Sequence, residues 1–263
     1  MQQLHHRYVA LGSRLVGVPE VNTLGVKSDF HEYSKQEQQQ ILNAAVILYP
    51  TLNYAQLFTT MGKRIFPSVE TYLYADEKIK QTTLFNMLAI PHPRTRFYLQ
   101  RDFLKILNDF AFPFIAKIPR ASARGRGVFK IGNPTDLDQY LQQVKTAYIQ
   151  EYIPHEKDLR VILINYEPVL AYWRRRSPDD YRTNLYQGGQ IDFADIPDEI
   201  MPVVRDYARR CKFNDVGLDL LEYRGKWYVI EANMMYGREG FKKKNLVLKE
   251  VIRSKLLAGT LLN

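Results

Sequence analysis

The sequence predicts an α+β fold, preceded by a short α/β unit at the N-terminus. Apolar runs of strand length, such as "FPFIAK" and "GVFKI", alternate with single segments of helical pattern along most of the chain. This alternation favours layered sheets with helices packed on them. Residues 1–75 hold too few such segments for a complete dinucleotide-binding fold, and they contain no GxGxxG motif. We therefore expect a reduced α/β domain there.

Composition places the chain among globular proteins. It has 263 residues, of which 46% are hydrophobic and 25% charged. No stretch approaches the ~20 apolar residues of a membrane span, and the first residues lack the pattern of a signal peptide. The single cysteine, Cys211, excludes an internal disulfide framework and fits a reducing compartment. We expect a cytoplasmic protein with no membrane partner.

The positive charge of the chain is concentrated in a few segments. The formal net charge is +9, and the excess lies in "KIPRASARGRGVFK", "WRRRSP", "ARRCK" and "FKKKN". Basic proteins often bind nucleic acids or other polyanions. Clusters of this kind suit a phosphate-binding cleft at least as well as a nucleic-acid surface, and both alternatives stay open at this point.

The N-terminal unit is expected to contain two helices and two strands. "AAVILYP" is typical of a buried strand. The preceding "SKQEQQQILN" predicts a helix with Ser34 as its N-cap and Glu37 at the capping-box position. "NYAQLFTTMG" predicts a helix closed by Gly62, and "KRIFPS" a short strand stopped by its proline.

The remainder of the chain is expected to form two further domains. Helices are predicted for "DEKIKQTTLFNMLAI", "RDFLKILNDF", "NPTDLDQYLQQV" and "PDEIMPVVRDYARRCKF", and one basic amphipathic helix for "KKKNLVLKEVIRSKLLAGTLL". Strands are predicted for "TRFYL", "FPFIAK", "GVFKI", "AYIQEYI", "LRVILIN" and "YEPVLAYWRRR". We expect domains at residues 1–75, 76–145 and 146–263.

"GLDLLEYRGKWYVIEAN", residues 217–233, predicts a β-hairpin that carries acids at unusual places. A three-residue loop would pair Tyr223 with Trp227 and set Asp219 directly opposite Glu231, on one face of the sheet. Asn233 follows Glu231 by two residues and shares that face. A two-residue loop would send the acids to opposite faces, unless a bulge restores the register.

Two facing carboxylates have a direct chemical consequence. They repel each other and raise each other's pKa unless a cation lies between them. Carboxylate and amide oxygens of this kind suit Mg²⁺, which completes its coordination with water and phosphate oxygens. The alternative is a solvent-facing strand with ordinary polar residues. The hairpin alone does not decide between them.

"FIAKIPRASARGRGVFK" predicts a strand, a glycine-containing loop and a second strand. Gly125 and Gly127 let the backbone approach a ligand closely, and a loop of this build can cover a polyphosphate with N–H groups and cations. It is not a Walker A loop, because no Gly-Lys-Ser/Thr follows. The alternative is a basic surface hairpin. The cations are Lys117, Arg120, Arg124, Arg126 and Lys130.

Two later segments are candidates for ligand contacts. In "IQEYIPHEKDLR" an apolar strand can offer backbone groups to an adenine edge, and Asp158 and Arg160 are spaced to share a face. "YWRRRSPDDYRTNLYQGG" is rich in arginine, which binds carboxylate or phosphate bidentately, and strand alternation separates Arg175 from Arg174. An edge strand and a solvated charge run are the respective alternatives.

The order of these motifs is more specific than any one of them. A lysine-ended strand, a basic glycine loop, "QEYI", "DLR", an arginine-rich strand with "RTN" and "GG", then Asp and Glu-x-Asn follow one another. From about residue 70 to 245 this order resembles the ATP-grasp superfamily, in its RimK-type branch of carboxylate–amine ligases, which is related to glutathione synthetases and tubulin tyrosine ligases. The resemblance implies an ATP-grasp fold, in which two α+β subdomains clasp ATP.

The resemblance also implies roles for single residues. For the nucleotide and its phosphates these are Lys78, Lys117, Arg124, Gly125, Gly127, Gln150, Glu151, Tyr152, Ile153 and Asp158. For Mg²⁺ or Mn²⁺ they are Asp219, Glu231 and Asn233. For the transferred phosphate and the acyl substrate they are Arg160, Arg174, Arg175, Arg182 and Asn184. Which of Arg174 and Arg175 matches the family arginine stays open.

The activity that the resemblance implies is an ATP- and Mg²⁺-dependent, ADP-forming ligation of a small-molecule carboxylate to an amine through an acylphosphate. The acceptor would be a peptide, a protein C-terminus or a small amino compound, and glutamate the amino acid added. Where relatives often have Ser-Pro-Gly after the metal Asn, this chain has "NMMYGREG". A non-catalytic ATP-binding regulatory module is the alternative within the fold, and a basic nucleic-acid binder is the less favoured alternative from another class. Packing of the final helix in a homo-oligomer also stays open.

Overall fold

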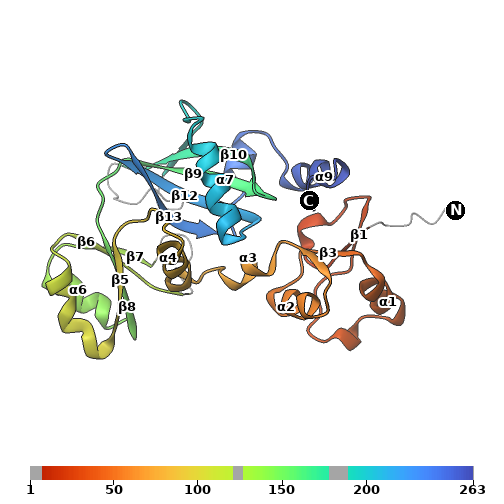
Figure 1. The fold of residues 1–263 in the computed structure, drawn as a ribbon, viewed down its shortest axis with the longest axis horizontal. Helices are drawn as coiled ribbons and strands as arrows, with labels where there is room; N and C mark the ends of the chain where they lie inside the picture. The colour runs from red at the N-terminus through yellow and green to blue at the C-terminus, as the bar shows by residue number, and fades with distance from the viewer. Residues whose placement is uncertain (1–7, 121–126, 178–188, 263) are drawn as a thin grey trace.

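The computed structural model describes residues 8–120, 127–177 and 189–262. Three sheets organise the described chain, and each carries its own helices (Figure 1). In Figure 1 the N-terminal sheet lies at the right, the five-stranded sheet at the upper centre and the second four-stranded sheet at the lower left. Among the described residues, no helix has both the length and the apolar character to cross a membrane.

The N-terminal unit is a parallel sheet of four short strands with strand order β2-β1-β3-β4. The capping box of Ser34 and Glu37 forms as predicted, and the left-handed Gly62 (φ 71°) follows the second helix. The strands are β1 Tyr8–Ala10, β2 Val21–Thr23, β3 Val46–Leu48 and β4 Arg64–Phe66. The helices are η1 Ser13–Leu15, η2 Phe30–Glu32, α1 Lys35–Asn43, α2 Leu52–Thr60 and α3 Val69–Leu73.

The second sheet is antiparallel with strand order β5-β8-β6-β7. Its strands are β5 Thr95–Leu99, β6 Phe114–Lys117, β7 Val128–Ile131 and β8 Thr146–Glu151. Its helical segments are α4 Lys78–Met87, η3 Gln100–Lys105, α5 Ile106–Asp109 and α6 Pro134–Leu141. Strand β8 begins just after residue 145 and still pairs within this sheet. The domain division at residue 145 stays a prediction.

The third sheet is antiparallel with strand order β11-β10-β9-β12-β13. Its strands are β9 Lys157–Ile164, β10 Glu167–Arg175, β11 Gln190–Asp192, β12 Asp215–Tyr223 and β13 Lys226–Asn233. Side chains of β9 alternate between two cores. Ile162 and Ile164 pack with the N-terminal unit, whereas Val161 and Leu163 pack with α7 Ile200–Cys211 on the other face (Figure 1).

The hairpin of β12 and β13 forms, but the predicted pairing of Tyr223 with Trp227 is wrong. Tyr223 pairs with Lys226 across a two-residue turn. Arg224 (φ 53°) and Gly225 (φ 72°) occupy that turn, as the primed hairpin turns require. The register then shifts at a β-bulge between Asp219 and Leu220. The bulge returns the acids to one face, which is the alternative that the sequence left open.

The predicted single helix at the C-terminal end is also wrong, because the chain forms two helices. These are α8 Glu239–Lys243 and α9 Leu248–Leu257. Asn245 adopts a left-handed conformation (φ 53°) just after α8. Leu246 N–H donates to the Phe241 carbonyl and Asn245 N–H to the Lys242 carbonyl. These two bonds are those of a Schellman cap, which ends the helix.

Helix α8 packs closely on the five-stranded sheet at Gly240. A Cβ at this position would stand 2.3 Å from Cε1 of Tyr172, a buried residue of β10. We predict that Gly240→Ala lowers the free energy of unfolding by about 1–3 kcal/mol, as overpacked cores do. Gly237→Ala is the matched control, since nothing lies within 4 Å of its Cβ position. Urea denaturation measures both, and equal stabilities of the two variants would contradict this packing.

Candidate active site

A row of polar side chains crosses the five-stranded sheet. Glu231 of β13 pairs with Asp219 of β12, Asp219 with Arg160 of β9, and Arg160 with Tyr172 of β10. Directly paired residues point to the same face of a sheet. The structure therefore brings three predicted site residues together and adds Tyr172, which the sequence did not single out.

The arginines of this face bind the aspartates in a buried network. Arg160 Nε and Nη2 each donate to a different oxygen of Asp219 at 2.6 Å. Arg174 Nη2 lies 2.9 Å from Asp219 Oδ2, and its Nε and Nη2 donate to Asp158 at 2.6 and 2.8 Å. All four residues are at most 7% exposed. Buried charges need such pairing, because an unpaired one would bear the full cost of leaving water.

The network keeps its central carboxylate ionised. Burial of Asp219 disfavours the charged form, but the two guanidinium groups outweigh it and hold its pKa below the ordinary value. Burial likewise opposes the charge of Arg174, yet Asp158 and Asp219 raise its pKa. At neutral pH the centre of the sheet therefore presents fixed, opposite charges.

Two lysines reach this face from the second sheet and its helix. Lys78 Nζ, on α4, lies 3.5 Å from Glu231 Oε1 and 3.5 Å from Asp76 Oδ1. Lys117, at the end of β6, is 4% exposed. Its burial lowers its pKa to about 8, although the charges of Glu231 and Asp219 act in the opposite direction. The two sheets thus turn their charged residues toward each other.

Gln81 is a site residue that the sequence did not reveal. Its Nε2 donates to the Ala232 carbonyl at 2.8 Å, and its Oε1 accepts from the Ala232 N–H at 3.1 Å. Strand β13 is the edge of its sheet, so the side chain of Gln81 takes the place of a neighbouring strand at the residue between Glu231 and Asn233. Its spacing of three from Lys78, which puts both on one face of α4, is the signal that was available.

The predicted metal ligands offer oxygen atoms of the right chemistry. Asp219 and Glu231 face each other, and Asn233 Oδ1 accepts from Met235 N–H at 3.0 Å. Both Asp219 oxygens already accept from arginine, but a carboxylate has about four acceptor sites. Two carboxylates and an amide oxygen form a hard donor set, which fits Mg²⁺.

In the segment predicted to contact adenine, residues 150–153, two polar side chains already form hydrogen bonds within the protein. Gln150 Nε2 donates to Thr95 Oγ1 at 2.9 Å. Glu151 Oε1 accepts from Arg94 N–H at 2.6 Å, and Ile153 is buried. With these two polar side chains engaged, contact of this segment with a base would run through its backbone and apolar atoms.

The remaining predicted residues divide into three groups. Lys130 Nζ lies 4.3 Å from the ring centroid of Tyr152, and the Gly127 carbonyl accepts from Ile118 N–H. Arg175 pairs with Asp192 at 2.8 Å, with 48% of its side chain exposed, away from the buried network. Arg124, Gly125, Arg182 and Asn184 lie outside the described residues.

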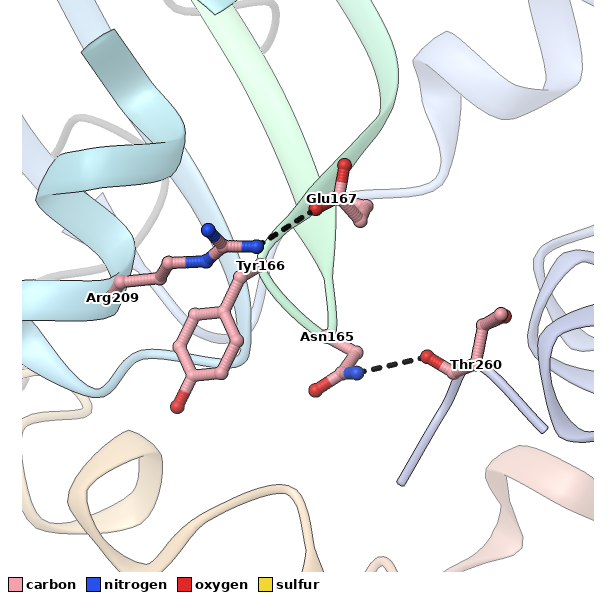
Figure 2. A pocket seen from close by; sticks show the side chains of 5 residues that line it. All are labelled: Asn165, Tyr166, Glu167, Arg209 and Thr260. Carbon is pink, nitrogen blue, oxygen red and sulfur yellow. Dashed lines mark hydrogen bonds and ion pairs between the residues drawn. The ribbon is translucent and has the colours of Figure 1, made fainter. Parts of the chain in front are cut away.

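A pocket of about 530 Å³ opens elsewhere, at the turn between β9 and β10 (Figure 2). An ion pair between Arg209 and Glu167 and a hydrogen bond from Asn165 to the Thr260 carbonyl cross its lining. It lies at the end of β9 remote from Asp158, and it contains none of the predicted site residues.

Comparison with known families agrees with this geometry. Residues 75–255 match the model of the RimK-like ATP-grasp domain. The chain belongs to the RimK-like ATP-grasp family. The predicted ATP-grasp fold is thereby confirmed, and solved structures support it. The chain matches a RimK domain ATP-grasp protein from Sphaerobacter thermophilus with a TM-score of 0.66 at 13% identity, over 95% of this chain and 99% of that one.

A second solved structure is the ATP-grasp ligase PsnB complexed with precursor peptide PsnA2 and AMPPNP. The TM-score is 0.69 at 18% identity, and the match covers 99% of each chain. Another PsnB complex contains Mg and ADP. At these identities the likeness shows the fold that this RimK-like chain shares with PsnB.

Curated relatives of this RimK-like chain are glutamate ligases. It is 27% identical over 191 residues to the coenzyme gamma-F420-2:alpha-L-glutamate ligase of Methanococcus maripaludis, covering 69% of this chain and 66% of the relative. It is 33% identical over 210 residues to the ribosomal protein bS6–L-glutamate ligase of Escherichia fergusonii, covering 77% and 69%. The chain spans about two thirds of the length of these relatives.

If Lys117 contacts a phosphate as predicted, nucleotide binding should depend on pH. Because its pKa is about 8, this lysine is partly neutral at pH 8, and a phosphate group nearby would raise its pKa. We predict proton uptake when a non-hydrolysable ATP analogue binds at pH 8, and affinity that falls as the pH rises further. Calorimetry in buffers of different ionisation enthalpy measures the uptake.

The control for this prediction is Lys117→Arg, since a guanidinium stays protonated throughout this pH range. The variant should bind the analogue without proton uptake at pH 8. Equal uptake in the wild-type protein and in Lys117→Arg would show that another group titrates.

Proposed function

We propose that this chain is an ATP- and Mg²⁺-dependent ligase that forms ADP and joins a carboxylate to an amine through an acylphosphate intermediate. One observation carries the proposal. Within a RimK-like chain, the acids Asp219 and Glu231 lie on the sheet face toward which Lys78 and Lys117 are turned. A polyphosphate with its metal ion needs this combination of oxygen ligands and cations.

We infer glutamate as the added amino acid and a peptide, a protein C-terminus or a small amino compound as the acceptor. The support is the names of the relatives, which are L-glutamate ligases acting on a coenzyme and on a ribosomal protein. We further infer action in the cytoplasm, which the single cysteine fits. The domain divisions at residues 75 and 145 are part of the same proposal.

In the first step, an oxygen of the substrate carboxylate attacks the γ-phosphorus of ATP. The bond from that phosphorus to the β–γ bridging oxygen breaks, and ADP leaves with the electron pair. Lys78 and Lys117 would hold phosphate oxygens, and Arg160 and Arg174 would offset the charge of the transferring group. Mg²⁺ held by Asp219, Glu231 and Asn233 would supply Lewis-acid stabilisation of the phosphate charge.

In the second step, the amine nitrogen attacks the acyl carbon of the acylphosphate. The carbon–oxygen bond to phosphate breaks, inorganic phosphate leaves with the electron pair, and the nitrogen loses a proton as the amide forms. No nucleophilic side chain is required, so the task of the protein is to position the reactants and stabilise charge. Of the two candidate arginines, Arg174 is the one proposed to contact the phosphate and acyl substrate, because Arg175 pairs with Asp192 outside the buried network.

The alternative functions have less support. A nucleic-acid surface gains nothing from the facing carboxylates Asp219 and Glu231, which would repel the phosphate backbone. A non-catalytic ATP-binding module would keep the same nucleotide contacts, and it differs only in the absence of turnover.

Glu231 is the residue whose substitution tests the proposed metal site. We predict that Glu231→Gln reduces ADP formation by at least about 100-fold, because it removes a charged ligand from the phosphate site. Glu222→Gln on the same hairpin is the matched control, since Glu222 is exposed and its Oε1 accepts a hydrogen bond from the Gly225 N–H in the turn. ADP release is measured with glutamate and a panel of peptide and amine acceptors.

The Glu222→Gln control should keep its activity within about twofold of the wild-type protein, as surface substitutions do. Full turnover in Glu231→Gln would contradict the metal assignment. Nucleotide binding by the wild-type protein without turnover on any acceptor would favour the non-catalytic module.

A further inference from the structure

The N-terminal unit contacts the loop that follows Asn233. We propose that Arg14 is a positioning residue for the metal-binding end of β13, and that it acts through Tyr236 and Asp215. The inference rests on the proposed role of Asn233 and adds to it a residue from outside the RimK-like domain. Residues 14 and 236 lie in different units of the fold and meet only in the folded chain.

The contact is a triangle of hydrogen bonds between the partly buried Arg14 and two buried side chains. Arg14 Nη1 donates to Asp215 Oδ2 at 3.1 Å and to the Tyr236 hydroxyl at 3.4 Å. The Tyr236 hydroxyl donates in turn to Asp215 Oδ1 at 2.6 Å. Asp215 is 2% exposed and Tyr236 4%. Each of the three side chains thus forms hydrogen bonds with the other two, and loss of one side chain leaves a buried polar group without its partner.

Arg14 is itself held within the N-terminal unit. Its guanidinium carbon lies 5.1 Å from the ring centroid of Tyr49 and 5.4 Å from that of Tyr236. Both distances are within cation–π range. Gly12 N–H donates to the Tyr49 carbonyl at 2.8 Å, and a Cβ on Gly12 would stand 2.8 Å from that oxygen. The backbone that carries Arg14 is therefore packed directly against Tyr49.

Tyr236 connects Arg14 to Asn233. It packs over Gly217, where an added Cβ would lie 3.1 Å from Tyr236 Cβ, and Gly217 is the cross-strand partner of Asn233. Met235, the residue before Tyr236, donates its N–H to Asn233 Oδ1. The orientation of the Asn233 side chain therefore depends on the path of the loop that Tyr236 anchors.

The test compares variants that keep charge and size. Tyr236→Phe removes only the hydroxyl, and Arg14→Lys keeps the charge but loses the planar guanidinium. Arg253→Lys is the matched control. Arg253 of α9 binds Glu20 of the N-terminal unit through two hydrogen bonds of 2.9 and 2.7 Å, so it joins the two units without contacting the loop.

The measurement is the Mg²⁺ concentration that gives half-maximal binding of a fluorescent non-hydrolysable ATP analogue, together with the affinity for the analogue in chelator. We expect Tyr236→Phe and Arg14→Lys to raise the Mg²⁺ midpoint about fivefold, the equivalent of one hydrogen bond. Their affinity for the metal-free analogue should be unchanged. Arg253→Lys should leave both quantities unchanged.

Two results would overturn the positioning role. One is a Mg²⁺ midpoint in Tyr236→Phe and Arg14→Lys that stays within twofold of the wild-type value. The other is an equal shift in Arg253→Lys, which would mean that joining the units matters and the loop does not. A wild-type protein that binds the analogue equally with and without Mg²⁺ would instead overturn the proposed function, and this inference with it.

Discussion

The bidentate ion pair between Arg160 and Asp219 is the interaction on which the rest of the site depends. It joins the central strand β9 to its neighbour β12 on a buried face, and removal of either partner would leave a buried charge at a cost of about 3–5 kcal/mol. Arg174 and Asp158 extend the pairing to β10. The buried charges are thus matched across strands β9, β10 and β12, and they support the face on which the β12–β13 hairpin sets Glu231 opposite Asp219.

The lysines that face this sheet, Lys78 and Lys117, are suited to bind an anion. Lys117 is buried enough for its pKa to fall to about 8, so a phosphate oxygen beside it would offset the cost of that burial. Lys78 is already within 3.5 Å of Glu231, and Gln81 on the same helix holds the backbone of β13. Helix α4 therefore links the two sheets that the ATP-grasp fold closes on a nucleotide, and the N-terminal unit contacts the loop after β13 through the bond of Arg14 with Tyr236.

Motif order and strand alternation were enough to predict the fold and the acidic hairpin. The facing of Asp219 and Glu231 was predicted as well, but through the wrong turn, because a β-bulge depends on local backbone geometry that residue types do not specify. The break at Asn245 was missed for the same reason, since a left-handed residue ends an otherwise continuous helical pattern. The spacing of Gln81 from Lys78 could have placed Gln81 on the site face of its helix, but not beside Ala232. That contact, the ion pairs of Arg174 and the contact of Arg14 with Tyr236 join residues distant in sequence, and the pattern of a single sequence does not record such pairs.

The charged face of the five-stranded sheet is proposed to bind a nucleotide together with its metal ion. The most direct test is calorimetric titration of a non-hydrolysable ATP analogue into the folded protein, first with Mg²⁺ and then with a chelator. We expect tight binding with Mg²⁺ and much weaker binding once the metal is removed. No heat of binding in either condition, from protein whose folding is verified by circular dichroism, would contradict it.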